Sequence, residues 1–70
     1  MFNRLKISSM KIKDAREISL CPQKYSDDEL RLAYLKLTNQ ALREFPSSPQ
    51  QSRTRQEYSL IQEEIKRRRD

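Results

Sequence analysis

The 70-residue chain contains no glycine, although glycine makes up about 7% of ordinary proteins. Glycine is the usual residue where the backbone needs a left-handed conformation, as in tight hairpins and in loops that wrap phosphate groups. Its absence therefore argues against hairpin-rich sheets and against glycine-rich nucleotide sites. We expect an all-α fold, and the length allows one small domain.

The central helix is predicted over residues 26–45, because its start and its end can both be read from the sequence. The stretch Ser-Asp-Asp-Glu that begins at Ser26 is a capping box. In this motif the Ser26 hydroxyl accepts a hydrogen bond from an unpaired amide of the first turn, and the Glu29 carboxylate reaches back to the serine amide. Pro46 disfavours a helical conformation at Phe45 and so predicts the end of the helix.

One face of this helix is predicted to line the core, because apolar residues recur there at three- and four-residue spacing: Leu30, Ala33, Tyr34, Leu37, Ala41 and Phe45, with Leu42 on the margin. Leu32 projects almost opposite this stripe, and Leu35 lies at its edge. Both leucines are close to the basic residues Lys36 and Arg43. Solvent-facing leucines are ordinary on their own, but two beside basic residues indicate a partner-binding surface.

Two further helices are predicted on either side of the central one. The first covers 14–20, with its start at Asp14 or as early as Ser9, and ends before Pro22. The last covers 49–68 and follows a second capping sequence, Ser-Pro-Gln-Gln, that begins at Ser48. These elements predict a short first helix packed on an antiparallel helical hairpin.

The helix over 49–68 has a thin apolar stripe that consists of Tyr58, Ile61 and Ile65. Leu60 projects elsewhere and joins the candidate partner-binding residues. The single helical domain is predicted over 14–70. Residues 1–13 alternate apolar and basic side chains and are predicted to form a basic flexible arm, or a strand added to a partner's sheet.

The net charge of +5 is concentrated at the two ends of the chain. Residues 14–65 hold seven basic and nine acidic residues, which gives a net charge of −2. The basic ends suit nucleic acid or an acidic protein surface, although solvated basic ends are equally common. The candidate contacts are Arg4, Lys6, Lys11, Lys13, Lys66, Arg67, Arg68 and Arg69.

Catalysis is not expected, and no catalytic residue, cofactor or metal site is assigned. The chain has no histidine and one cysteine, Cys21, which excludes a Cys/His metal site, an imidazole base and an intrachain disulfide. The carboxylates of Asp27, Asp28 and Glu29 are explained by helix capping and by the helix dipole. No run is apolar enough to enter a membrane, and we expect a cytoplasmic protein.

The segment 14–37 resembles the front half of a J-domain, the helical module of J-domain co-chaperones. In that family a short helix and a loop precede a helix of the form Ser-Asp-x-Glu-[Ile/Leu]-x-x-Ala-Tyr-x-x-Leu, and residues 26–37 match it throughout. The family's His-Pro-Asp triad should follow after four more residues, where this chain has Leu-Arg-Glu at 42–44. Stimulation of a DnaK-type chaperone ATPase depends on that triad in the family. The resemblance therefore implies an inactive J-like fold used for binding.

Two functions follow as hypotheses. The first is a non-catalytic protein-interaction module, such as an adaptor, a regulatory subunit or an assembly factor, that binds another protein or self-associates as a homo-oligomer. The alternative is a basic regulator that contacts nucleic acid through its ends or modulates a nucleoid protein. Short pieces at 24–30 and 46–48 are similar to the Hha-type modulators of bacterial nucleoid proteins.

Overall fold

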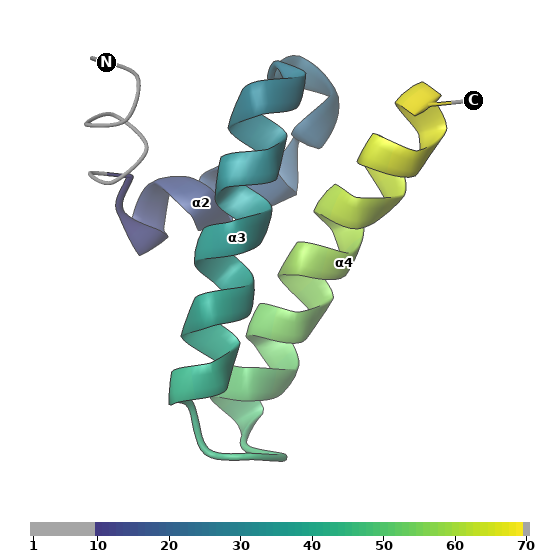
Figure 1. Cartoon of the computed structure of the whole chain (residues 1–70). Coiled ribbons are helices and arrows are strands. Elements are labelled where there is room, and N and C mark those ends of the chain that lie inside the picture. Colours follow the sequence, from purple (N-terminus) through teal and green to yellow (C-terminus); the bar gives the residue numbers. More distant parts are fainter. Residues whose placement is uncertain (1–9, 70) are drawn as a thin grey trace.

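The computed structural model describes residues 10–69, and the predicted contacts Arg4 and Lys6 lie outside the described residues. The described part is 83% helical and contains no strand, which confirms the all-α prediction. Its elements are α2 (Ile12–Leu20), the single turn η1 (Pro22–Lys24), α3 (Asp27–Arg43) and α4 (Pro49–Arg69). Helices α3 and α4 run in opposite directions, and α2 crosses behind α3 (Figure 1).

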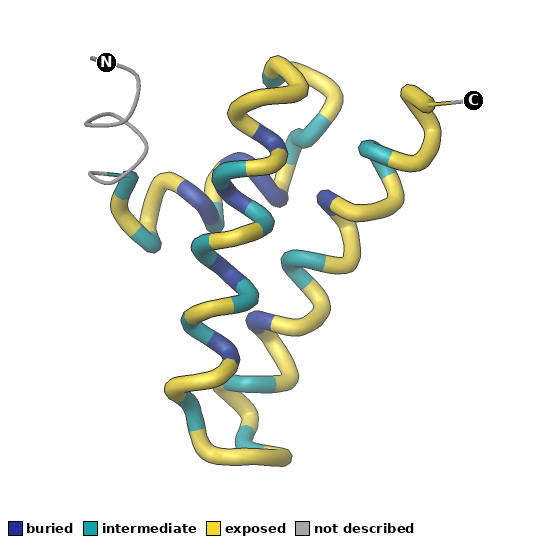
Figure 2. Tube along the Cα trace, in the orientation of Figure 1, coloured by how far each residue is buried: buried dark blue, intermediate teal, exposed yellow. Residues whose placement is uncertain are grey.

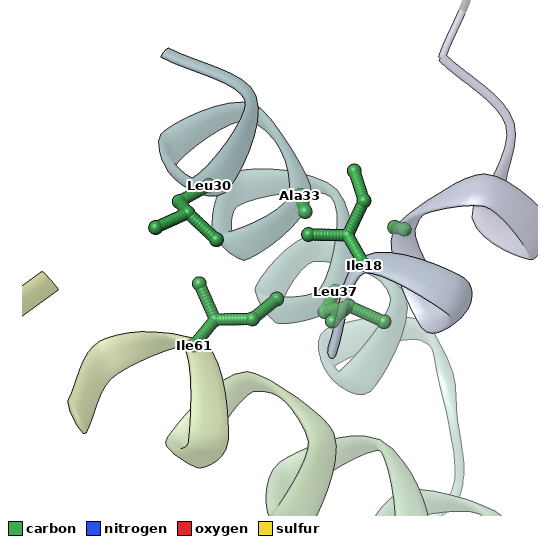
Figure 3. Close-up of a cluster of buried hydrophobic side chains, with 6 residues drawn as sticks. Ile18, Leu30, Ala33, Leu37 and Ile61 are labelled. Carbon is green, nitrogen blue, oxygen red and sulfur yellow. The ribbon is translucent and has the colours of Figure 1, made fainter. Parts of the chain in front are cut away.

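The core lies where the three helices meet, and the buried positions of each helix face this point (Figure 2). Side chains from all three helices point toward one another there (Figure 3): Ile18 of α2, Leu30, Ala33 and Leu37 of α3, and Ile61 of α4. Ala15 of α2 belongs to the same buried cluster. At the edge of the core the rings of Tyr34 and Tyr58 meet edge to face, with centroids 5.6 Å apart and planes at 82°. This aromatic pair joins α3 to α4.

Helix α3 starts as predicted. The Glu29 amide donates to the Ser26 hydroxyl at 3.3 Å, and the Ser26 amide donates to the Glu29 carboxylate at 3.0 Å. The predicted end at Phe45 is wrong, because the helix ends at Arg43 and Glu44 is extended, with φ −91° and ψ 156°. Phe45 is 83% exposed rather than part of the core stripe. The extended Glu44 directs its carboxylate to α2, and this contact replaces the last predicted turn.

Helix α2 starts at Ile12, between the two predicted starts at Ser9 and Asp14. Its N-cap residue Lys11 makes no side-chain capping bond, and Asp14 lies within the first turn rather than at the start. Met10 and Ile12 pack against the core, and their burial favours the earlier start. The packed part of the chain therefore includes residues that the sequence assigned to the arm.

The turn between α3 and α4 is built without glycine. Ser47 has a φ of 65°, a left-handed conformation that costs a non-glycine residue about 1–2 kcal/mol. Three hydrogen bonds of Gln51 hold this turn. Its amide donates to the Ser48 hydroxyl at 3.1 Å, its side-chain oxygen accepts from the Ser47 amide at 3.0 Å, and its side-chain nitrogen donates to the Ala41 carbonyl at 3.0 Å. The second capping prediction is confirmed.

Candidate protein-binding surfaces

The structure separates the candidate leucines onto two sides of the α3–α4 hairpin. Leu35 and Leu42 are 56% and 83% exposed, and their seven-residue spacing places them on one line along α3. Leu60 lines a hollow together with Leu20 of α2, so it faces the side of the hairpin on which α2 lies. Leu32 is half-buried rather than fully solvent-facing. The predicted partner-binding set therefore does not form one patch.

The first candidate surface is the hairpin face, which we define as the exposed side of α3 and α4 away from α2. On α4 it consists of residues at three- and four-residue spacing that are all exposed: Arg55, Ser59, Gln62, Lys66 and Arg69. Arg69 lines a small hollow with Arg31 of α3 and Ile65. This shared hollow places the α4 stripe on the same side of the hairpin as Arg31 and the exposed leucines of α3.

The hairpin face carries bases and almost no acids. From residue 30 to residue 43, α3 contains Arg31, Lys36 and Arg43 and no acidic residue. The α4 stripe adds three more bases, again without an acid. The carboxylates of the first α3 turn lie at one end, where Glu29 is held in the capping box. The result is a positive surface interrupted by two exposed leucines.

Several of the acidic side chains are instead gathered around α2. The Arg16 guanidinium lies 2.8 Å from the Glu57 carboxylate and 3.8 Å from that of Glu44, and it donates to the Thr54 hydroxyl at 3.4 Å. Gln40 also donates to Glu44, at 3.2 Å. The other Glu44 oxygen, Oε1, is buried and has no hydrogen-bond partner within residues 10–69. This network joins all three helices and is structural, because its groups are enclosed between them.

Arg68 was predicted to contact nucleic acid, but its guanidinium is already occupied. It donates to the Asp27 carboxylate at 2.7 Å and to the Glu64 carboxylate at 2.9 Å, and to the carbonyls of Pro22 and Gln23 at 3.3 Å each. The hydrogen bonds to Asp27 and then to Glu64 raise the pKa of Arg68 above its usual value. Arg68 therefore ties the end of α4 to the start of α3.

The remaining basic candidates do not converge on one site. Lys13 lines a hollow with Arg53 near the start of α2. Arg67 pairs with Glu64 at 3.7 Å, near the opposite end of α4, where Lys66 and Arg69 are exposed. The two basic ends of the sequence thus give separate positive regions in the described structure. Of the bases in the α4 stripe, Lys66 and Arg69 were predicted as contacts and Arg55 was missed, although it lies at a helical interval of 11 residues from Lys66.

The second candidate surface is the α2–α4 face, which consists of two hollows that meet at Leu20. The first hollow, of about 420 Å³, includes Ile12 and the charged residues Lys13, Arg16, Glu17, Arg53 and Glu57. The second, of about 270 Å³, includes Leu60 and the charged residues Glu63, Glu64 and Arg67. Leu20 lines both hollows and is 74% exposed, and Leu60 is 44% exposed. Acids and bases are balanced on this face.

Comparisons with models of protein families, with curated proteins and with solved structures find no match to this chain. Among residues 10–69, no three Cys, Asp or Glu side chains come together in a way that could hold a metal ion. None of the helices in the same stretch is both long and apolar enough to span a membrane. The surfaces described above are therefore the basis for a functional argument.

Proposed function

We propose that this protein is a non-catalytic interaction module whose hairpin face binds an acidic, amphipathic segment of another protein. One observation carries the proposal: Leu35 and Leu42 are exposed on a stretch of α3 that contains three bases and no acid. An exposed apolar line flanked by charges of one sign favours a partner with apolar anchors and charges of the opposite sign.

The spacing of the two leucines suits a helical partner. Residues seven apart on a helix are separated by about 10 Å along its axis, because each residue rises about 1.5 Å. A partner helix with apolar residues at the same interval can pack along this line, as amphipathic helices do in other helix-binding surfaces. Leu32 is three residues before Leu35 on the same helix, and it would flank such a partner.

The charge of the hairpin face selects the chemistry of the partner. Four bases lie on this face: Arg31, Arg55, Lys66 and Arg69. A surface of one sign attracts acidic segments and repels basic ones, and it raises the rate of encounter at low ionic strength. We therefore expect the partner segment to be rich in Asp or Glu and its binding to weaken as salt is added.

The J-like resemblance is compatible with this proposal. The order of a short helix, a loop and a capped helix is present as α2, η1 and α3, and the chain has no histidine for the family's triad. An inactive J-like fold would keep the helical surfaces of the family without its ATPase stimulation. Such a fold supports a binding role. The partner would then be determined by the exposed residues of this chain.

Affinity capture from an extract of the native host tests the proposal, with captured species identified by mass. We expect the double variant Leu35→Gln, Leu42→Gln to capture about tenfold less of a protein partner, because a few apolar anchors carry most of the energy of such interfaces. The matched control is Leu20→Gln, since Leu20 is exposed to a similar degree on the other side of the hairpin. Equal loss in both variants would contradict the proposal.

Nucleic acid is the competing ligand, because the α4 stripe holds Arg55, Lys66 and Arg69 without an acid. Nuclease treatment of the extract separates the two cases. A protein partner that survives nuclease supports the proposal. If capture is lost on nuclease treatment, and the purified protein binds duplex DNA with a steep salt dependence, the hairpin face is a phosphate-binding surface and the proposal is wrong.

A further inference from the structure

We infer that the hollow between Arg31 of α3 and Arg69 of α4 binds a phosphate group carried by a phosphorylated side chain of the hairpin-face partner. The inference rests on the proposed function for the source of the phosphate, and it deepens that function by naming one charged group of the partner. Three observations support it: the size of the hollow, the two arginines in it that have no acidic partner, and its place on the line of the exposed leucines.

The size of the hollow limits the ligand to a small group. The hollow has a volume of about 50 Å³ and is lined by residues of α3 and α4: Asp27, Arg31, Ile65, Arg68 and Arg69. One water molecule needs about 10–15 Å³ of such a space, so the hollow admits a group of about four heavy atoms. A phosphate group with its free oxygens is of this size, whereas a nucleotide base or an aromatic ring is not.

The arginines of the hollow differ in whether their charge is already neutralised. Arg68 is paired with Asp27 at 2.7 Å and with Glu64 at 2.9 Å, so the acid that lines the hollow is engaged. Arg31 and Arg69 form no ion pair and no side-chain hydrogen bond with any residue from 10 to 69. Two positive charges at the hollow are therefore left without a local counter-ion.

Two such guanidinium groups favour a dianion over a single carboxylate. A phosphorylated side chain carries a charge of about −1.5 to −2 at pH 7 and can neutralise both arginines, whereas a carboxylate carries a single negative charge and neutralises one. The planar fork of N–H donors on arginine matches the oxygens of phosphate and donates two parallel hydrogen bonds to them. Because Arg31 and Arg69 belong to different helices, they can hold the phosphate from two directions.

The hollow lies at one end of the line of exposed leucines. Leu35 and Leu42 follow Arg31 by four and eleven residues, intervals that return to the same side of a helix. Arg31 is therefore about 6 Å from Leu35 along the axis of α3, since each residue rises about 1.5 Å. A partner helix that packs on the two leucines would place the residue one turn beyond its first apolar anchor at the hollow. This register predicts a phosphorylated Ser or Thr about three or four residues from that anchor.

Titration of the purified full chain with inorganic phosphate and with acetate, at about pH 7.5 and constant ionic strength, tests the hollow itself. Proton–nitrogen NMR spectra that include the arginine side-chain signals follow the binding. We expect saturable shifts at Arg31 and Arg69, and we expect phosphate to bind at least about fivefold more tightly than acetate. Arg31→Gln and Arg69→Gln should each weaken phosphate binding by about fivefold or more, because each removes charged hydrogen-bond donors.

Arg67→Gln is the matched control for these two variants. The Arg67 side chain is 82% exposed at the same end of α4, but it lines the hollow beside Leu60. Its removal should change phosphate affinity by less than about twofold, because salt screens charges that do not touch the ligand. Circular dichroism checks that the helices are retained. Equal effects of the three variants, equal affinities for phosphate and acetate, or shifts that do not saturate overturn the inference.

Phosphatase treatment of the native-host extract before affinity capture tests the source of the phosphate. We expect the wild-type protein to capture about fivefold less of its partner after treatment. The double variant Arg31→Gln, Arg69→Gln should capture equally little with and without treatment. A partner that depends on Leu35 and Leu42 but is captured equally well after phosphatase treatment overturns this inference and leaves the proposed function intact. Capture that neither phosphatase nor the leucine variants reduce overturns both.

Discussion

The hairpin face and the α2–α4 face both expose leucine, but they arrange charge in different ways. On the hairpin face the exposed Leu35 and Leu42 lie on a stretch of α3 that contains bases and no acid. On the α2–α4 face the exposed Leu20 and Leu60 lie among acids and bases in equal number. Exposed leucine on its own does not identify a partner, and the surrounding charge limits which partners each face can bind.

Helix α2 is the origin of this difference. Arg16 of α2 draws Glu44 and Glu57 toward itself from the end of α3 and from α4. Glu63 and Glu64 also line the hollow beside α2. Because these acids lie on one side of the hairpin, the bases of α3 and α4 on the other side are left without local neutralisation. A domain with a modest net charge thereby gains one strongly positive side.

The largest effect is expected in the core that both faces share. Leu37→Ala removes a fully buried side chain at the contact of the three helices. We expect a loss of about 2–5 kcal/mol in the free energy of unfolding, which can unfold a domain of this size. Chemical denaturation followed by circular dichroism measures the loss. If Leu37→Ala lowers the free energy of unfolding by less than Leu42→Gln does, the assignment of Leu37 to the core and of Leu42 to the surface is wrong.

The sequence predicted the parts of the fold that depend on neighbouring residues. The Ser26 and Ser48 caps are confirmed because each needs only a partner three residues away. The early end of α3 was not predicted, since it depends on a contact between Glu44 and Arg16 of another helix. The Arg16–Glu57 pair spans 41 residues, and no local sequence pattern predicts such a contact.

The candidate surfaces were predicted only in part for the same reason. Helical periodicity placed Leu35 outside the core stripe, and the structure agrees, with Leu35 56% exposed. Periodicity within one helix says nothing of which neighbour covers a given side, so Leu60 was grouped with leucines that lie on the other side of the hairpin. The exposure of Leu20 also depends on where α2 crosses, which the sequence did not specify.

A second prediction concerns Arg16, which holds α2 against α3 and α4 and so supports the α2–α4 face but not the hairpin face. Arg16→Met leaves the carboxylates of Glu44 and Glu57 without their shared cation, and we expect a loss of about 2 kcal/mol in the free energy of unfolding. A partner of the hairpin face should still bind the folded fraction. The control is Arg53→Met, whose side chain is 73% exposed and whose loss should cost less than about 0.5 kcal/mol. Denaturation midpoints that coincide for the two variants would contradict the structural role of Arg16.

A third prediction concerns the Ser26 cap at the start of α3. This cap stabilises the whole domain and so supports both faces. Ser26→Ala removes the hydroxyl that caps the first turn, and we expect a loss of about 1 kcal/mol. Ser59→Ala is the control, because Ser59 is exposed in the middle of α4 and alanine favours the helix. Thermal unfolding followed by circular dichroism measures both. An unchanged midpoint for Ser26→Ala would show that the capping box contributes nothing measurable.

The smallest effects on stability are expected on the hairpin face itself. Leu35→Gln and Leu42→Gln should each change the free energy of unfolding by less than about 0.5 kcal/mol, the usual range for surface sites. Leu32→Gln is the sharper comparison, since Leu32 is half-buried and should cost about 1 kcal/mol. Urea denaturation separates these values. If all three variants lose as much as Leu37→Ala does, the leucines belong to the core and this face is not a binding surface.

The unequal starts of the helices have a consequence for the order in which the domain opens. Helices α3 and α4 each begin at a serine that caps them locally, and Gln51 joins them at their turn. Helix α2 begins at Lys11 without a side-chain cap. Least supported locally, α2 should be the first segment to detach, and its amides should exchange with solvent at lower free energy than those of the hairpin. Such partial opening would remove the α2–α4 face while α3 and α4 remain folded. The two surfaces would therefore be lost at different temperatures.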